Sequence, residues 1–180
     1  MDGMSKRTFS IRPIRKTDYP QIKEIYEHGL DSGHATYERH ALPWEKFVAV
    51  KIMSTVYVAV EEDDEEKVLG WVSAAPINSR EVFRGVVEDS VYVHPDAQGR
   101  GVAGALLDQL IKVCEEQGRW GIHAWIFPEN SGSRRLHESR GFQKVGTYSH
   151  LAKMPYGELA GHWRDTEVWE KLLPKPDIDV

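Results

Sequence analysis

Only one of the 180 residues, Cys114, is a cysteine, so the chain cannot form an internal disulfide. No apolar run approaches the roughly 18 residues that a membrane-spanning helix needs. The polar residues 1–8 lack the apolar stretch and the small-residue cleavage site of a secretory signal, so we expect no signal peptide. These absences predict a cytoplasmic protein that does not enter a membrane.

The sequence also lacks an excess of positive charge. It has 23 Lys and Arg against 28 Asp and Glu, which gives a formal net charge of -5. A nucleic-acid surface needs clustered Lys and Arg to contact phosphates, so we expect no nucleic-acid partner. No metal site is predicted either. A small anionic ligand is compatible with this charge, because it needs only a local pocket.

The apolar content is sufficient for one domain. Hydrophobic residues make up 41% of the chain, and a protein of 20.6 kDa normally buries well over half of its unfolded surface. We therefore predict a single domain over residues 9–173, with tails at 1–8 and 174–180.

Hydrophobic periodicity predicts a mixed series of helices and strands, and hence an α+β fold with a central sheet. Thr17 is expected to cap a first helix, whose apolar residues recur at three-to-four spacing up to Leu30. The clearest helix has an apolar stripe from Ala103 to Cys114 and a natural stop at Gly118. Two further helices are predicted at 43–53 and 131–139, and strands at 9–14, 55–60, 68–75, 86–93, 121–127, 143–149 and 166–172.

A glycine-rich segment, Gly99 to Gly104, lies between the strand at 86–93 and the start of the clearest helix. The first amides of a helix have no partner within it, and the helix dipole adds partial positive charge there. Such a turn therefore suits a pyrophosphate, and side chains at Gly99 or Gly101 could hold a phosphate away. The alternative is a purely structural role, in which these glycines only permit a tight turn.

The same glycines also match the dinucleotide fingerprint, but the strand and the acidic residue that accompany that fingerprint are not at the required positions. That fingerprint begins directly after a strand and needs an acidic residue about twenty positions on. Here five loop residues intervene, and the later segment at 122–127 contains no Asp or Glu. A P-loop is excluded because no Gly-Lys-Ser or Gly-Lys-Thr follows.

Three segments follow one another along the chain: Val91 to Pro95, Gln98 to Ala103, and 136–142. In this order they resemble the GNAT superfamily. Gln98 to Ala103 fits its acetyl-CoA segment, which reads Gln or Arg, two residues, Gly, one residue, Gly or Ala. Val91 to Pro95 is similar to the strand before that segment, and 136–142 is similar to the second motif, which closes on the pantetheine arm. The resemblance implies an acetyl-CoA-dependent N-acetyltransferase with a mixed, mostly antiparallel sheet flanked by helices. It places the cofactor at Val91, Tyr92, Val93, Gln98, Gly99, Arg100, Gly101, Val102, Ala103, Gly104, Asn130 and Ser133.

Catalysis by such an enzyme needs a base, since an amine with a pKa near 10.4 is free in only about one molecule per few thousand at pH 7. The strand from Val87 to Val93 resembles that of phosphinothricin acetyltransferases, which implies that Glu88 is the general base. A salt-bridged edge carboxylate is the alternative. By strand alternation, Asp89 points to the other face and is a weaker candidate.

The leaving thiol has a pKa near 8.5, so a loosely placed acid suffices. His137 stands where many members of the superfamily have a tyrosine that protonates the thiolate. It could donate a proton or bind the cofactor, or it could only pack and hydrogen-bond. Backbone N–H groups at 91–93 are expected to hold the carbonyl oxyanion.

The resemblance to the phosphinothricin and methionine sulfoximine acetyltransferase branch covers about residues 9–172 and implies a homodimer. Segments 35–38, 75–84 and 162–165 look like the loops of that branch. Arg80 or Arg84 could bind the carboxylate of an amino acid, and Tyr37 and Phe83 could wall its side-chain pocket. Each could equally be an ordinary surface or packing residue. The segment 154–161 is longer than the resemblance leads us to expect.

Two other functions fit the same motifs. One is a GNAT acetyltransferase for another amine, such as a polyamine, an aminoglycoside or a protein N-terminus. The other is an acyl-CoA-binding module without catalysis. A cationic or peptide substrate would favour an open acidic groove, and an intact Glu88 argues for catalysis.

Overall fold

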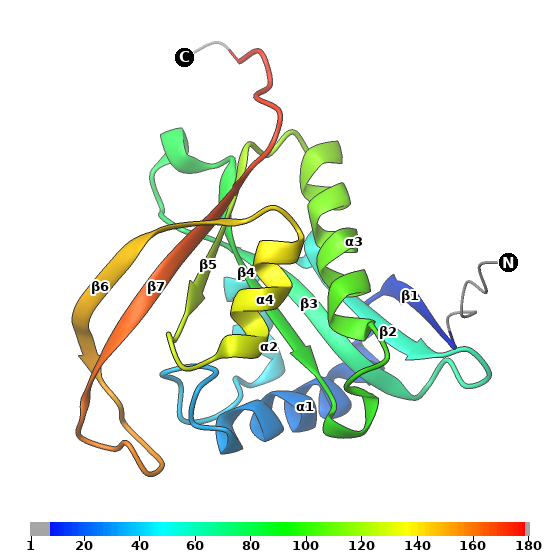
Figure 1. The fold of residues 1–180 in the computed structure, drawn as a ribbon. Helices are drawn as coiled ribbons and strands as arrows, with labels where there is room; N and C mark the ends of the chain where they lie inside the picture. The colour runs from blue at the N-terminus through cyan, green and yellow to red at the C-terminus, as the bar shows by residue number, and fades with distance from the viewer. Residues whose placement is uncertain (1–7, 179–180) are drawn as a thin grey trace, which may run out of the picture.

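The computed structural model describes residues 8–178, which form one seven-stranded sheet in the order β1-β2-β3-β4-β5-β7-β6 (Figure 1). Only the β4–β5 pair is parallel, and the other pairs are antiparallel. The predicted α+β class with a mixed, mostly antiparallel sheet is therefore confirmed. The strands are β1 (Phe9–Pro13), β2 (Tyr57–Glu61), β3 (Val68–Pro76), β4 (Val86–Val93), β5 (Gly121–Ile126), β6 (Gln143–Lys153) and β7 (Trp163–Leu172).

Helices cover both faces of the sheet (Figure 1). On one face, α3 (Val102–Glu116) and α4 (Ser131–Ser139) pack over a buried cluster that includes Leu106, Leu107 and Phe142. On the other face, α1 (Tyr19–Asp31) and α2 (Trp44–Val50) enclose a second cluster around Trp71. The chain thus forms a three-layer arrangement, with Glu88 on the sheet in the middle layer and His137 on α4 in the layer beside it.

The helix α3 follows its sequence signals closely. Leu106, Leu107 and Leu110 are fully buried, because they lie on one stripe that faces the sheet. Gly101 precedes the helix in the left-handed conformation, with φ of 80°, and Gly118 ends it with φ of 69°. Both conformations favour glycine over any L-residue with a side chain.

The strands β4 and β5 separate halfway along the sheet. Their pairing ends at Glu88 with His123, although β4 continues to Val93 and β5 to Ile126. On its other edge, β4 stays paired with β3 along its length. The sheet therefore opens into a gap beside the second half of β4.

Several predicted boundaries differ from the structure, and the helix predicted at 43–53 is shorter, at Trp44–Val50. A short 3-10 turn covers Lys16–Asp18, so α1 begins at Tyr19 and Thr17 is not its cap. Instead the carboxylate of Asp18 accepts the main-chain N–H of Arg15 at 2.7 Å and binds Arg12. The closing strands are longer than predicted, because β6 and β7 continue past a register irregularity between Tyr148 and Ala152, a stretch of weak strand propensity.

Within residues 8–178, none of the helices combines the length and the apolar character needed to cross a bilayer. Most of the predicted N-terminal tail, residues 1–7, lies outside the described residues, as do 179–180. Residues 174–178 have no regular structure.

Candidate active site

A cavity of about 900 Å³ opens where β4 and β5 separate. Its walls come from α1, the loop 32–43, α2, β4, the start of α3 and α4. Elements from the whole chain thus converge on one site. The predicted site residues that line it are Tyr37, Glu88, Val91, Tyr92, Val93, Gln98, Ala103, Asn130, Ser133 and His137.

Side chains of β4 alternate between the two layers, as the sequence predicts. Tyr92 packs against the aromatic cluster below α1, with its ring stacked on Trp71 at 5.1 Å. Val87 and Val91 contact the opposite cluster below α3. Glu88 therefore faces the α1 and α2 side, together with Tyr92.

The main chain of β4 presents polar groups to the gap. The N–H of His94 donates to the carbonyl of Leu69 at 2.8 Å. The main-chain N–H and C=O groups of every second residue before His94 in β4 therefore also point toward β3. The intervening residues Val91 and Val93 point theirs toward β5, which has already diverged. Their N–H groups are consequently available to a ligand in the gap.

The glycine segment joins β4 to α3 at one end of this cavity. Gly99 and Gly101 both have positive φ, 77° and 80°, and a Cβ added to either would meet no atom within 4 Å. The backbone thus lies open on this side, as an approaching phosphate would require. Gln98 and Ala103 line the cavity on either side of these glycines.

Three other residues of this segment have structural partners. The Arg100 guanidinium donates to both carboxylate oxygens of Glu61 at 2.9 Å and to Thr8, so only its main chain remains for a cofactor. Val102 is buried in the core. Gly104 leaves room for the Arg140 side chain, which would lie 2.1 Å from an added Cβ.

Glu88 lies in the cavity without an ion-pair or hydrogen-bond partner among residues 8–178. Burial raises the pKa of its carboxyl above the ordinary value, the charge of Asp89 raises it further, and Lys51 opposes both. A carboxylate with a raised pKa is a better proton acceptor near neutral pH. The geometry therefore suits the predicted general base better than a salt-bridged edge residue.

His137 and Asp89 form a buried pair across the gap, from α4 to β4. The His137 Nε2 lies 2.8 Å from Asp89 Oδ2, and Nδ1 lies 2.7 Å from the Ser133 carbonyl. Burial alone would lower the pKa of His137, but the charge and hydrogen bond of Asp89 and the Ser133 carbonyl raise it overall. Both ring nitrogens are thus engaged within the protein, which fits the packing role better than proton donation to a ligand.

Asn130 and Ser133 sit at the start of α4. The Asn130 side chain accepts the N–H of Ser133 at 3.1 Å, as a helix cap does, and donates to the His34 carbonyl at 3.0 Å. Both residues line the cavity. The Asn130 side chain also joins the loop between β5 and α4 to the loop 32–43.

Tyr37 lines the cavity, as predicted. Its loop is supported by Arg164, which the sequence did not single out as a site residue. The Tyr37 hydroxyl is 2.8 Å from Thr166 Oγ1, and its ring packs edge-on against Phe127. Arg164, 4% exposed, donates to the Gly33 carbonyl and lies 3.7 Å over the Phe127 ring. The Tyr156 hydroxyl binds the Thr36 carbonyl at 2.7 Å, so the long segment 154–161 also holds this loop.

Three predicted substrate residues do not line the cavity. Arg80, Phe83 and Arg84 lie on the loop between β3 and β4, where the 3-10 turn Glu81–Phe83 is exposed. Arg84 pairs with Glu81 at 3.5 Å and lies over the Trp120 ring. Within the single chain, this loop does not supply the cation for a carboxylate.

Lys51, at the end of α2, supplies a cation that sequence reasoning missed. Its side chain lines the cavity, and its ammonium donates to Ser90 Oγ at 3.1 Å. Nothing in the local sequence marks it, because its position depends on how α2 packs against β4. Asp89 is a weaker base candidate by strand alternation, and its contact with His137, 48 residues away, has no local sequence signal either.

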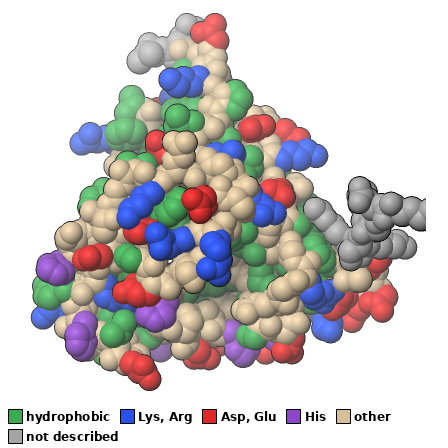
Figure 2. Space-filling model, in the orientation of Figure 1, with side chains coloured by type: hydrophobic (Ala, Val, Ile, Leu, Met, Phe, Trp, Pro, Cys, Tyr) green, Lys and Arg blue, Asp and Glu red, His purple; other side chains and the backbone are tan. Residues whose placement is uncertain are grey.

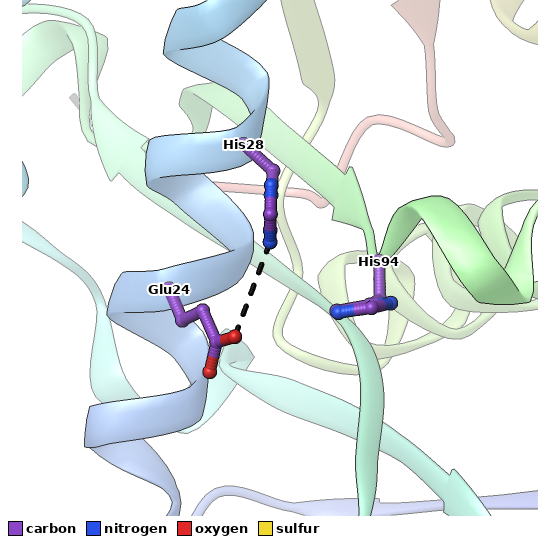
Figure 3. A group of neighbouring side chains, drawn as sticks. All are labelled: Glu24, His28 and His94. Carbon is purple, nitrogen blue, oxygen red and sulfur yellow. Dashed lines mark ion pairs between the residues drawn. The ribbon is translucent and has the colours of Figure 1, made fainter.

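Three possible metal ligands meet at the outer rim, although the sequence predicts no metal. Glu24 and His28 lie one turn apart on α1, and His94 comes from the end of β4 to face them (Figure 3). The His28 ring is 3.9 Å from the Glu24 carboxylate. His94 Nδ1 accepts the Asp96 N–H at 3.1 Å, so one of its two nitrogens is already used.

Cationic side chains gather on the face that carries α4 (Figure 2). Some are neutralised by the protein itself, since Arg134 and Lys144 both contact Glu167, at 3.1 and 2.9 Å. Arg135 is exposed on α4.

The comparisons with known proteins agree with this geometry. The acetyltransferase (GNAT) family model matches residues 15–142. The chain is 34% identical to the L-amino acid N-acyltransferase MnaT of Escherichia coli, over 87% of this chain and 89% of that protein. It is 32% identical to the L-methionine sulfoximine/L-methionine sulfone acetyltransferase of Salmonella typhimurium, over 87% and 90%.

A solved structure is similar as well. The phosphinothricin acetyltransferase of Sinorhizobium meliloti, in complex with acetyl-CoA, superposes with a TM-score of 0.78 at 29% identity. The match covers 92% of this chain and 89% of that one. A mixed sheet that opens beside a glycine-lined helix start defines a class of acyl-CoA-dependent transferases. The chain belongs to the acetyltransferase (GNAT) family and is an N-acetyltransferase of that family.

Proposed function

We propose that this enzyme transfers the acetyl group of acetyl-CoA to the amino group of a small amino acid of the phosphinothricin or methionine sulfoximine type. The observation that carries the proposal is the gap between β4 and β5, which places Glu88 in the same cavity as Gln98 and Ala103. The relatives that act on amino acids or their analogues support the choice of substrate.

The residues present fit acetyl-CoA. The open main chain at Gly99 and Gly101, with the start of α3, suits its pyrophosphate, and the N–H groups of Val91 and Val93 suit the pantetheine arm and the thioester oxygen. The cofactor supplies an activated acetyl group. The expected absence of a metal stays a prediction.

In the proposed reaction, Glu88 first accepts a proton of the substrate ammonium, directly or through water, and the free amine then attacks the acetyl carbonyl. As the C–S bond breaks, the new amide loses its second N–H proton to water. The N–H groups of β4 stabilise the negative charge that develops on the carbonyl oxygen. The thiol has a pKa near 8.5 and can leave as a thiolate. His137, bound to Asp89, holds α4 against β4 rather than donating the proton.

We also propose a homodimer and a cytoplasmic location. Large apolar side chains are exposed on the strands β5, β6 and β7, and two of them, Trp125 and Tyr148, have ring centroids 5.6 Å apart. Such a patch is typical of an interface. The single cysteine, Cys114, is buried and unpaired, and burial raises its pKa to about 11, as suits an inert thiol in a reducing compartment.

The test is free-thiol release from acetyl-CoA with a panel of amines. We expect turnover with L-phosphinothricin, methionine sulfoximine and methionine sulfone, and little with polyamines or peptides. If another amine turns over while every amino-acid analogue stays unreacted, the substrate assignment is wrong. If acetyl-CoA binds but no amine reacts, the chain is a binding module.

A further inference from the structure

Two opposite charges line the cavity, and neither has an ion-pair partner within residues 8–178. One is the carboxylate of Glu88, and the other is the ammonium of Lys51. The Lys51 ammonium has three donor hydrogens, and Ser90 Oγ accepts one of them at 3.1 Å. Its other hydrogens have no acceptor in the described part of the chain.

Burial makes the charged form of the Lys51 ammonium less favourable. Burial lowers the pKa of Lys51, and the charges of Glu88 and Asp89 only partly offset that effect. A half-buried cation without a counter-charge is stabilised by any anion that reaches it. The Trp71 ring, 6.0 Å from Nζ, adds a weak cation–π contact but no hydrogen-bond acceptor.

The positions on β4 beside the two charges are spaced suitably for a zwitterion. Glu88 and Ser90 share one face of β4 and are two residues apart, or roughly 6.6 Å along the strand. In an α-amino acid the ammonium and the carboxylate are attached to the same carbon. With a charge-assisted hydrogen bond of about 2.8 Å at each end, such a molecule can reach from Glu88 to Lys51.

Two buried polar groups lie near these residues. The Trp71 indole N–H and the Ser73 hydroxyl are both buried, and neither has a hydrogen-bond partner within residues 8–178. Ser73 lies directly across from Ser90 in the β3–β4 pair. A buried donor without a partner is uncommon and is often satisfied by a ligand or a bound water.

We propose that Lys51, with Ser90, forms the subsite for the α-carboxylate of the acceptor, whose amine lies at Glu88. This inference rests on the proposed amino-acid substrate and assigns to Lys51 the role that the sequence predicted for Arg80 or Arg84. The subsite takes a free carboxylate next to the reacting amine. An acceptor amine without that carboxylate gains nothing from it.

The experiment measures kcat/KM for three acceptors: L-methionine sulfone, its carboxamide, and the corresponding amine without the carboxylate. Each is tested with the wild type and with Lys51→Met, Lys51→Gln and Lys51→Arg. Lys23→Met is the matched control, because Lys23 lines the same cavity from α1. The acetyl-CoA Kd and the melting temperature of each variant show whether it is folded.

We expect Lys51→Met and Lys51→Gln to lower kcat/KM for L-methionine sulfone about 10- to 100-fold, the range of a hydrogen bond to a charged group. The values for the two acceptors without a carboxylate should change less than about 3-fold by the same reasoning, and Lys51→Arg should restore part of the discrimination. If the folded Lys51 variants keep the wild-type preference for the carboxylate, or if Lys23→Met abolishes it, the subsite is wrong. If the wild type itself prefers the amine without a carboxylate, the proposed function fails instead.

Discussion

At the scale of single residues, the chemistry of the site depends on which charged side chains are buried in it. Glu88 has no cation within ion-pair distance in the described chain, so its carboxylate is free to accept a proton. The Glu88→Gln substitution keeps the shape of the side chain and removes this basicity. We expect kcat to fall by at least about 100-fold, the usual contribution of a general base, with an unchanged Kd for acetyl-CoA.

The measurement is thiol release under saturating acetyl-CoA, with Glu81→Gln as the control. Glu81 is an exposed carboxylate on the 3-10 turn before β4 and does not line the cavity. Full turnover by a folded Glu88→Gln variant would remove Glu88 from the mechanism.

The Asp89–His137 pair predicts a pH dependence of stability. The pKa of His137 is raised in the folded protein, so its contribution is fully present below the unfolded value of about 6.5. It is lost as the pH rises through the raised value. We expect Asp89→Asn to lower the free energy of unfolding by about 1 to 3 kcal/mol at pH 6, and by less as the pH increases.

Urea unfolding of the wild type and Asp89→Asn from pH 6 to pH 9 measures this difference. Asp108→Asn is a suitable control, since Asp108 pairs with Arg140 at the half-exposed surface of α3. A difference between wild type and Asp89→Asn that stays constant over this range would contradict the linkage.

At the scale of elements, α3 lies between two glycines that share a left-handed backbone conformation and differ in their surroundings. Gly101 starts the helix beside the cavity, whereas Gly118 ends it at the far side. Alanine at either position must adopt a left-handed conformation, so each variant should lose about 1 to 2 kcal/mol of stability. Only Gly101→Ala should also weaken acetyl-CoA binding, by about tenfold or more if its amide contacts the pyrophosphate.

Thermal unfolding and titration calorimetry with acetyl-CoA separate the two effects. Equal losses of stability with equal acetyl-CoA affinities would show that Gly101 serves the turn alone. Weakened binding in Gly118→Ala would show that helix stability controls the site indirectly.

The elements also show what a sequence can predict. The stripe of α3, its glycine ends and the alternation of β4 are local patterns, and the structure has them where the sequence places them. Lys51, Arg164 and the partner of Asp89 depend on packing between segments far apart in the chain, so no local pattern marks them. Arg80 and Arg84 have suitable chemistry, but their loop does not reach the cavity of the single chain.

At the scale of the whole molecule, the outer face of β5, β6 and β7 connects the surface to the site. Trp125 is 45% exposed and also lines the cavity, and its ring packs against Tyr148. Val145, on the same strand as Tyr148, is 60% exposed. A second copy of the chain that covers this patch would therefore approach the acceptor side of the cavity.

The proposed dimer can be tested without altering any residue that lines the cavity. We expect the wild type to be a dimer by light scattering at micromolar concentration. The double variant Val145→Lys, Tyr148→Lys should be monomeric there, because two buried charges per chain oppose association. Since the proposed acetyl-CoA site lies on the α3 side, the Kd for acetyl-CoA should stay within about threefold. KM for the amino acid should rise, because Trp125 would lose its cover. A wild type that is itself monomeric would contradict the dimer, and a dimeric double variant would place the interface elsewhere on the chain.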